Sequence, residues 1–364
     1  MMIFIAYIIF VFSTLLLLVS ITNLIFREQT TACNSYSKHK VSVLIPARNE
    51  EKNIALLLTD LIEQKYKDIE IIVFNDQSTD NTAQIITNFA KKDSRIKLIN
   101  SSEIPHNWLG KNFACHSLSK YASGRHLLFL DADVRIHGDI IYEAVTFVQK
   151  YKLGLLSIFP SQRMKSLSEW LTVPIMNQIL LSLLPLVLVR KSKFSSLAAA
   201  NGQFMLFNAN NYAETLPHQK FKDNKVEDIE IARFYKQNKI KTACLIGTSS
   251  IACRMYNNYE DALNGFSKNV VNFFGNSYLA AIIFWFITTF GLLVIGTTLG
   301  VKTTLIYIII IGMRRVITSY LSNQNIINNL LLAIPQQFTL GIFIIKSIIN
   351  KSKNQFEWKG RNIS

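Results

Sequence analysis

The sequence predicts an α/β protein in which a mostly parallel sheet, covered by helices, lies between apolar segments that cross a membrane. Three features of the 364 residues point there: an uncharged stretch at residues 1–26, alternating apolar strands and helical stretches across residues 41–250, and an apolar last quarter. Hydrophobic residues make up 49% and charged residues 17%. This composition is too apolar for a disordered chain and too poor in charge for an ordinary soluble enzyme.

The first segment, residues 1–26, is long enough to span a bilayer, which takes about 20 apolar residues. It has no Lys or Arg before Arg27 and no clear small-residue cleavage site, so we expect an uncleaved anchor and not a secretory signal. The positive charges of Arg27, Lys38, Lys40 and Arg48 then place the following residues in the cytoplasm by the positive-inside rule.

The central segment predicts alternating strands and helices. Its short apolar runs are typical of strands, and the stretches between them have apolar residues at helical spacing. Strands that are apolar on both faces indicate a parallel sheet covered by helices, whose ligands bind beyond the carboxyl ends of the strands. The expected strands are Val41–Ile45, Ile69–Phe74, Arg95–Ile99 and His126–Leu130, and the expected helices are Asn53–Gln64 and Thr82–Ala90.

Polar clusters follow three of these strands, at Pro46–Glu51, Asn75–Asp80 and Asp131–Asp133. Each cluster alone is compatible with ordinary turn and helix-capping chemistry. Their joint placement at strand ends predicts one shared site. Asp131 and Asp133 offer the hard oxygen ligands that suit Mg²⁺ or Mn²⁺ bridging a substrate diphosphate. The sequence has neither G-x-x-x-x-G-K-[ST] nor G-x-G-x-x-G, so ATPase and dinucleotide-binding functions lose their main support.

A further acidic pair, Glu227-Asp228, follows a lysine-rich loop and begins the helical stretch Ile229–Tyr235. Acidic side chains at the start of a helix stabilise it through the helix dipole. The alternative is that one of the two carboxylates acts as a general base beside the metal site. The residues alone leave both interpretations open.

Taken in this order, the motifs resemble those of family 2 glycosyltransferases with the GT-A fold. The resemblance extends to Trp108–Lys111, Gly154–Ser157, Arg254–Tyr256 and Glu357–Arg361, which are similar to the membrane-bound branch that glucosylates the carotenoid acid diaponeurosporenoate. It implies a GT-A (Rossmann-like) nucleotide-sugar domain with N-terminal and C-terminal transmembrane helices.

The resemblance also implies roles for individual residues. Asp228 is expected to be the catalytic base with Glu227 beside it, and Asp133 is expected to hold the metal. Lys111 is expected near the donor, although a solvated surface lysine is an alternative. The residues expected to bind the nucleotide-sugar are Pro46, Ala47, Arg48, Glu50, Asp76, Lys111 and Asp131. The residues assigned to the acceptor side are Asn201, Gly202, Gln203, Arg254 and Lys268. For Asn201–Gln203 the alternative is that the segment only forms a turn.

Two departures from the family pattern affect these expectations. Gln77 stands where the family usually has glycine, which puts the shape of that turn in question. The Q-x-x-R-W motif of processive synthases is missing, and Gly265–Asn269 is the nearest segment, with Phe266 in place of an aromatic Trp. We therefore expect one sugar per acceptor and no polymer.

The C-terminal region predicts two crossings. Residues 269–301 include the spanning helix Leu279–Leu299, and residues 316–345 are expected to span once, with Pro335 inside. Because the run 303–313 is short, we expect residues 303–322 to be interfacial or part of a broken helix. The uncharged run Trp170–Val189 is expected to lie in the membrane interface, with a buried core helix as the alternative.

The expected organisation is an anchor at 1–26, a cytoplasmic GT-A domain at 27–265 with an interface segment at 166–190, a transmembrane region at 266–350 and a basic cytoplasmic tail at 351–364. The net charge of +15 indicates contact with anionic membrane lipid and not with nucleic acid. The four cysteines form no C-x-x-C motif, which indicates reduced thiols.

The expected function is inverting, metal-dependent transfer of one sugar from a UDP-sugar to a lipophilic acceptor by a multi-pass protein of the cell membrane. The resemblance implies glucose as the sugar and a carotenoid acid as the acceptor. Within enzymes, the alternatives are another lipid acceptor, such as diacylglycerol, a ceramide-like lipid or polyprenyl phosphate, and a nucleotidyltransferase. A membrane scaffold without catalysis is the non-enzymatic alternative. The presence of Asp131, Asp133 and Asp228 argues against it.

Overall fold

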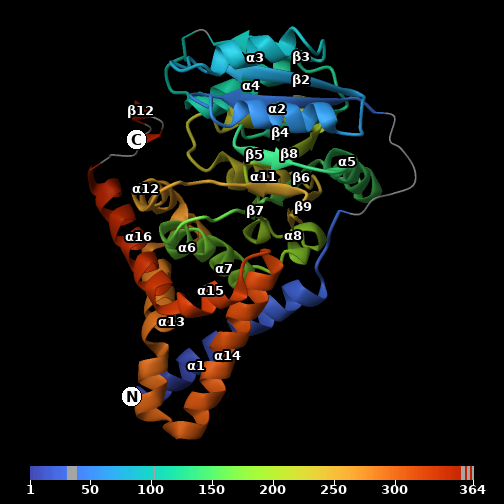
Figure 1. Cartoon of the computed structure of the whole chain (residues 1–364). Helices are drawn as coiled ribbons and strands as arrows, with labels where there is room; N and C mark the ends of the chain where they lie inside the picture. The colour runs from blue at the N-terminus through green and yellow to red at the C-terminus, as the bar shows by residue number, and fades with distance from the viewer. Residues whose placement is uncertain (31–38, 102, 354–356, 359–360, 363–364) are drawn as a thin grey trace. The chain divides into compact units, whose positions relative to one another are not determined.

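The computed structural model describes residues 1–30, 39–101, 103–353, 357–358 and 361–362. Contacts divide the chain into two compact units. The α/β unit consists of Glu28–Ser161 and Leu186–Cys253, and the helical unit of Met1–Arg27, Gln162–Pro185 and Arg254–Ser364 (Figure 1). Cys33 and Lys38, for which the sequence predicted a reduced thiol and a cytoplasmic charge, lie outside the described residues.

A seven-stranded sheet forms the centre of the α/β unit. Its strands are β1 (Val41–Ala47), β2 (Ile69–Asn75), β3 (Ile96–Asn100), β4 (His126–Leu130), β6 (Leu155–Phe159), β8 (Phe204–Asn208) and β9 (Thr242–Ile246). They lie in the order β3-β2-β1-β4-β8-β6-β9. Every neighbouring pair is parallel except the two that β8 makes with β4 and β6. The expectation of a mostly parallel sheet is therefore confirmed.

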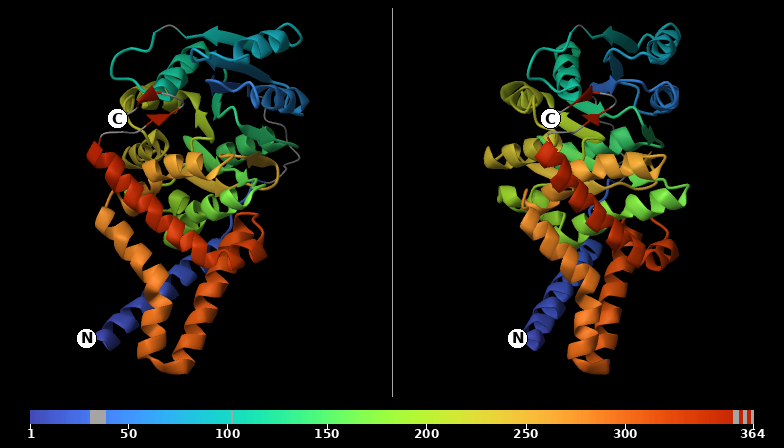
Figure 2. Two further views of the ribbon diagram at one scale, coloured as in Figure 1. Left: turned by 60° about the vertical axis from the view of Figure 1, so that its left-hand side comes forward. Right: turned by 90° about the vertical axis from the view of Figure 1, so that its left-hand side faces the viewer.

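Helices cover both faces of this sheet (Figure 2). They are α2 (Ile54–Glu63), α3 (Thr82–Ala90) and α5 (Ile140–Tyr151) on one face, and α4 (Gly110–Tyr121) and α11 (Glu227–Gln237) on the other. Val43 and Ile45 pack with the first group, and Leu44 between them packs with the second. Successive side chains of a strand point to opposite faces, so a strand buried on both faces must be apolar at every position.

Shorter elements complete the α/β unit. β5 (Val134–Ile136) pairs antiparallel with β10 (Ile251–Cys253). The remaining helices are α8 (Val187–Lys191), η1 (Ser195–Leu197), α9 (Ala209–Thr215) and α10 (Pro217–Lys220). The chain passes between the units at β7 (Ser161–Gln162). Among the described cysteines, Cys115, Cys244 and Cys253 are buried free thiols.

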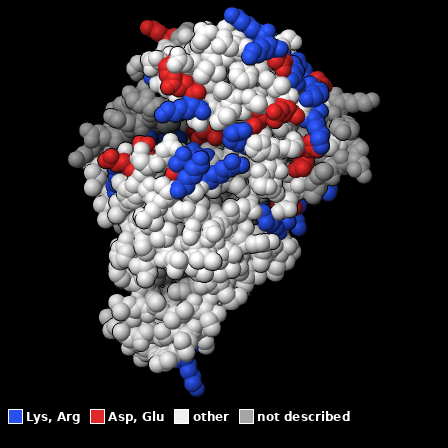
Figure 3. Space-filling model, viewed as in Figure 1, with Lys and Arg blue, Asp and Glu red and all other residues white. Residues whose placement is uncertain are grey.

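The helical unit contains three helices that are long and apolar enough to cross a membrane: α1 (Met2–Ile25), α13 (Tyr278–Thr298) and α14 (Gly300–Leu321). They contact one another pairwise. The surface over them is almost free of charged residues (Figure 3). The other elements of this unit are α6 (Leu167–Thr172), α7 (Pro174–Leu183), α12 (Tyr259–Asn269), η2 (Val270–Phe274), α15 (Ile326–Leu331), α16 (Ala333–Lys353), β11 (Glu357–Trp358) and β12 (Arg361–Asn362).

Two expectations for the C-terminal region are wrong. For residues 303–322 the broken helix is wrong, because α14 runs unbroken from Gly300 to Leu321, whereas the interfacial alternative stays a prediction. Residues 316–345 are not one helix, because they are divided among α14, α15 and α16. The uncharged run 316–345 does not coincide with a helix, because Arg314 and Arg315 lie inside α14 and do not end it. Pro335 is accommodated in the first turn of α16, where its missing N–H has no helical partner to lose.

The uncharged run Trp170–Val189 is divided among α6, α7 and α8. Every residue from Pro174 to Ser182 in α7 is buried. For this part of the run, the burial agrees with the alternative of a buried core helix. Half of the basic tail, residues 354–356, 359–360 and 363–364, lies outside the described residues.

Candidate active site

Hydrogen bonds join the loops that follow β1 and β2. The register pairs Ala47 with Asn75, so the two strands end at the same edge of the sheet. Arg48 Nη1 donates to the carbonyl of Asp76 at 2.8 Å, and the Asp76 N–H donates to Ala47 O at 2.8 Å. The first two polar clusters therefore form one structure, in which Pro46, Ala47, Arg48, Glu50 and Asp76 lie together.

The same loops are joined again by Asn49 and Asp80. Asn49 Oδ1 accepts from the N–H of Thr79 at 2.9 Å, and Asp80 Oδ2 accepts from the N–H of Glu51 at 3.1 Å. Burial raises the pKa of Asp80, but hydrogen bonds from Thr82 and Glu51 outweigh it and hold that pKa below its usual value. Asp80 is thus an ionised acceptor that fixes the two loops together.

Gln77 adopts the left-handed backbone conformation, with φ of 51°. Side chains are strained there and glycine is not, which is why a glycine suits this turn.

We expect Gln77→Gly to stabilise the protein by about 0.5–1 kcal/mol, because it removes the strain of a side chain at positive φ. The matched control is Gln84→Gly in the interior of α3, where the same change should destabilise by about 1 kcal/mol. Thermal unfolding of both full-length variants in one detergent measures the difference. A lower midpoint for Gln77→Gly would contradict the strain at this turn.

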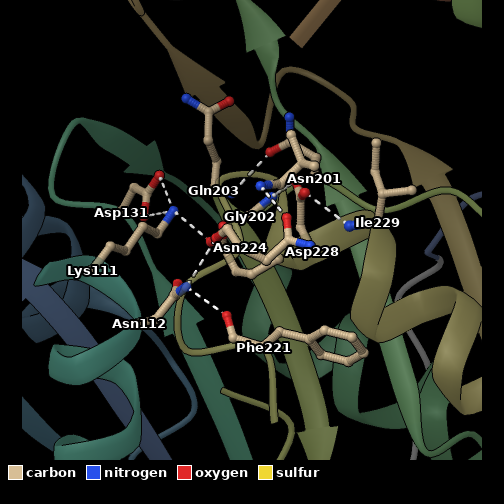
Figure 4. Close-up of polar contacts among 12 residues, drawn as sticks. Lys111, Asn112, Asp131, Asn201, Gly202, Gln203, Phe221, Asn224, Asp228 and Ile229 are labelled. Atoms are coloured by element: carbon tan, nitrogen blue, oxygen red, sulfur yellow. Dashed lines mark hydrogen bonds and ion pairs between the residues drawn. The ribbon is translucent and has the colours of Figure 1, made fainter. Parts of the chain in front are cut away.

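Lys111 stands at the centre of the acidic residues (Figure 4). It lies in the first turn of α4, and its Nζ is 2.8 Å from Asp131 Oδ1 and 3.7 Å from Glu227 Oε1. Burial lowers the pKa of Lys111, but the charges of Asp131 and Glu227 outweigh it and hold that pKa above its usual value. Lys111 is therefore a permanent cation within the site, and the alternative of a solvated surface lysine is wrong.

The Asp228 carboxylate is held by two backbone N–H groups. Gly202 N donates to its Oδ2 at 2.9 Å, and Ile229 N donates to its Oδ1 at 2.8 Å (Figure 4). A Cβ on Gly202 would lie 3.0 Å from Lys111 Nζ, so the glycine gives room for this close approach. The start of α11 is thereby fixed against the segment Asn201–Gln203.

Burial raises the pKa of both members of the acidic pair. The pKa of Glu227 is raised to about 7, against the opposing charge of Lys111 and with a further contribution from Asp228. The pKa of Asp228 is raised by burial and lowered by Lys111 and by its two backbone hydrogen bonds. With its pKa near neutrality, the Glu227 carboxyl group can accept and release a proton at physiological pH.

The loops after β1 and β2, Lys111, Asp131 and Gly202 lie in a segment that matches a known family, and Glu227 and Asp228 follow that segment in the chain. The model described as Glycosyl transferase family 2 matches residues 42–216. This is a family 2 glycosyltransferase domain. The protein that carries it is a glycosyltransferase, and the sheet and helices described above are its GT-A fold.

Two curated relatives of the glycosyltransferase carry the same name. The 4,4'-diaponeurosporenoate glycosyltransferase of Staphylococcus aureus (strain USA300) is 27% identical over 369 residues, which cover 93% of this chain and 92% of the relative. That of Staphylococcus haemolyticus (strain JCSC1435) is 28% identical over 233 residues and 63% of this chain, but the match spans only 60% of the relative.

A solved structure shares the fold of the glycosyltransferase. It is the mannosyltransferase PcManGT from Pyrobaculum calidifontis in complex with GDP-Man and Mn²⁺. The TM-score is 0.60 at 16% sequence identity, and the match covers 96% of this chain and 100% of that one.

Asn112 of the glycosyltransferase was not predicted from the sequence. It is 1% exposed, and its Nδ2 donates to the carbonyls of Phe221 at 2.8 Å, Asn224 at 3.0 Å and Lys222 at 3.2 Å (Figure 4). The loop that it holds leads directly into Glu227-Asp228. Its position next to Lys111 was the available signal, but its partners are more than 100 residues away in sequence.

We expect Asn112→Ala to lower kcat/KM about tenfold and to destabilise the glycosyltransferase by about 1–3 kcal/mol, because buried carbonyls lose their donor. The matched control is Asn88→Ala on α3, where the asparagine is exposed. Asn112→Gln, which keeps the amide, should recover part of the loss in kcat/KM. Unchanged kcat/KM in Asn112→Ala would show that the loop holds its position without this side chain.

The residues at the carboxyl end of β4 suit a divalent cation that takes only part of its ligands from the protein. Asp131 and Asp133 are the acidic residues there, and the described residues contain no group of three His, Cys, Asp or Glu able to hold a metal by themselves. Mg²⁺ and Mn²⁺ often take few protein ligands and complete their shell with water and substrate phosphates. The donor set therefore fits a cation that arrives with a diphosphate, and it does not fit a cage made of protein alone.

The remaining acceptor-side residues are divided between the two units. Gln203 is buried, and its Nε2 donates to Cys253 Sγ at 2.9 Å, within the α/β unit. Arg254 and Lys268 belong to the helical unit. The guanidinium of Arg254 pairs there with the buried carboxylate of Glu169 at 2.6 Å. Within the α/β unit, Gly202 donates to Asp228, and the carbonyl of Gln203 accepts from the N–H of Asp131 at 3.2 Å.

Proposed function

We propose that this glycosyltransferase transfers one sugar from a UDP-sugar to a lipophilic acceptor, with inversion at the sugar carbon, at the cytoplasmic face of the membrane. The observation that carries the proposal is the Asp228 carboxylate, held by the N–H groups of Gly202 and Ile229 beside the Lys111–Asp131 pair. A base held in place at the carboxyl ends of the strands is what activation of an acceptor requires.

The donor is proposed to lie along the ends of β1, β2 and β4. The joined loops that carry Arg48 and Asp76 offer backbone and side-chain groups for a nucleoside. Asp131 and Asp133 would hold a divalent cation, Mg²⁺ or Mn²⁺, which when bound neutralises negative charge on the departing diphosphate. The Mn²⁺ in the mannosyltransferase that shares the fold supports a divalent cation, and uridine as the base rests on the family resemblance.

Chain residues supply the other parts of the transfer. Asp228 takes the proton of an acceptor hydroxyl as its oxygen attacks the anomeric carbon, and the leaving group departs on the opposite side. Lys111 provides positive charge beside the diphosphate, where negative charge increases as the bond breaks. Glu227 lies 3.7 Å from the Nζ of Lys111, and the charges of Lys111 and Asp131 act on Asp228.

A carotenoid acid is the acceptor that the curated relatives support, because two of them carry that name and one matches 93% of this chain. The three apolar helices α1, α13 and α14 fit an acceptor that resides in the bilayer. Other lipids, such as diacylglycerol, a ceramide-like lipid or polyprenyl phosphate, would use the same base and donor groups and form the second candidate.

The test measures UDP release from UDP-glucose by the full-length protein in membranes, with Mg²⁺ or Mn²⁺ and with or without a carotenoid acid. The proposal expects release that requires the acid and is lost in Asp133→Ala. Glu63→Ala, which removes an exposed carboxylate from α2, is the matched control and should behave like the unmodified protein. Release without acceptor dependence would contradict the carotenoid acid, and no release from any UDP-sugar by folded protein would contradict the donor.

A further inference from the structure

Two adjacent arginines lie inside an apolar helix of the helical unit. Arg314 and Arg315 are in α14, one of the three helices that are long and apolar enough to cross a membrane. Each is only 6% exposed. Charged side chains at such positions are rare because their burial in an apolar medium is costly, and they commonly mark a functional site.

The hydrogen bonds of the two guanidinium groups all go to neutral oxygen atoms. Arg315 donates to Gln336 Oε1 at 2.7 Å and to the carbonyls of Asn329 and Ala333, both at 3.0 Å. Arg314 makes one side-chain hydrogen bond within the described residues, to Ser182 Oγ at 3.3 Å. An arginine has five N–H donors, so Arg314 retains most of its capacity for another ligand.

No carboxylate of the helical unit balances these two charges within the described residues. The acidic residues of this unit are Glu169, Glu260, Asp261 and Glu357. Glu169 is bound by Arg254 at 2.6 Å, and Glu260 and Asp261 are exposed at the start of α12. The side chain of Glu357 lies outside the described residues. None of the ion pairs of the described residues includes Arg314 or Arg315.

Neighbouring positive charges in a poorly polarisable environment repel each other and lack the water that would stabilise them. Neutral hydrogen-bond acceptors compensate such charges only in part, whereas an oxyanion compensates both the charge and the unused donors. Guanidinium groups bind carboxylate and phosphate groups through paired hydrogen bonds. The buried arginines therefore indicate an anionic ligand.

A small pocket of about 10 Å³ lies beside both arginines. Gln178 and Gln336 line it, while Ile175 and Leu340 give it an apolar side. A space of this size holds one water-sized group. A single oxyanion oxygen therefore fits there, and the rest of the head group, with its apolar chain, lies outside the pocket.

We propose that Arg314 and Arg315 bind the oxyanion head group, a carboxylate or a phosphate, of a membrane amphiphile. The head group accepts hydrogen bonds from Arg314 and Arg315, and its apolar chain continues beyond Ile175 and Leu340 into the lipid. None of the residues that line the pocket is assigned to the donor, and binding there requires neither a nucleotide-sugar nor transfer. It goes beyond the proposed function and can fail while that function holds.

The test measures lipid binding to the full-length protein in neutral detergent by native mass spectrometry. The probes are phosphatidylglycerol and a long-chain fatty acid, each compared with its neutral counterpart, phosphatidylcholine or a long-chain alcohol. The unmodified protein should retain at least one anionic probe about tenfold more strongly than its counterpart. Retention of the fatty acid alone identifies a carboxylate amphiphile, and retention of phosphatidylglycerol alone identifies a phospholipid.

Arg314→Gln is the decisive variant because it removes a charge and only one hydrogen bond. It should reduce retention of the anionic probe about tenfold, and Arg314→Lys should recover part of it. Lys302→Gln removes an exposed cation from the same helix and is the matched control. Equal retention by Arg314→Gln and the unmodified protein, or equal retention of charged and neutral probes by the unmodified protein, would overturn the proposal.

Discussion

Replacing Asp228 by Asn should lower kcat for transfer to an alcohol acceptor by about 10²–10⁴-fold, the usual contribution of a general base. The amide has almost the same shape as the carboxylate but cannot take up a proton. If the acceptor is a carboxylic acid, it is already ionised near neutral pH, and its attack needs no base. The same variant should therefore keep part of its activity toward a carotenoid acid.

The ratio of the two activities separates chemistry from folding. Asn also turns one oxygen that accepts from Gly202 or Ile229 into a donor, so the variant loses a hydrogen bond worth about 1–3 kcal/mol at a buried site. A folding defect lowers both activities equally, whereas loss of the base lowers them unequally. Glu230→Gln, on the same helix and paired with Arg233, is the control. Equal losses with both acceptors in folded Asp228→Asn would show that Asp228 is not the base.

Replacing Lys111 by Met should lower kcat/KM for the donor by about 10²-fold or more, because a preorganised positive charge beside a leaving group contributes on this scale. It leaves Asp131, Glu227 and Asp228 close together without the cation that lies 2.8 Å from Asp131 and 3.7 Å from Glu227. Their mutual repulsion then also disfavours an approaching diphosphate.

The pH dependence gives a second readout of the same variant. Lys111 holds down the pKa of Glu227, which burial raises to about 7, and it also lowers the pKa of Asp228. Without it both pKa values rise, so the ionised pair forms only at higher pH. The rise of kcat/KM with pH should therefore move to the alkaline side in Lys111→Met.

Lys111→Arg keeps the charge and should keep most of the pH profile. Lys120→Met, which removes an exposed lysine from the same helix, should change neither quantity. A pH profile of Lys111→Met that coincides with that of the unmodified protein would contradict the electrostatic role of Lys111. A kcat/KM of Lys111→Met within threefold of that of the unmodified protein would also contradict this role.

The sequence determined the sheet and much of the site by local information. Thr82–Ala90 and His126–Leu130 were predicted with the bounds that the structure has, because apolar periodicity reports directly on burial along one element. Asp76 and Asp131 could be placed at the edge of the sheet because each follows a strand, whereas the roles expected for them and for Asp228 came from the family resemblance. The carboxyl ends of parallel strands always meet at one edge.

Only the tertiary structure decided how these residues act on one another. The Lys111 side chain lies between Asp131 and Glu227, which come from a strand end and a distant helix, and Asn112 binds a loop more than 100 residues away. Arg314 and Arg315 look in sequence like the end of an apolar run, yet α14 passes through them. Periodicity records which face of an element is apolar, but the free energy of a buried charge depends on partners that folding brings from elsewhere.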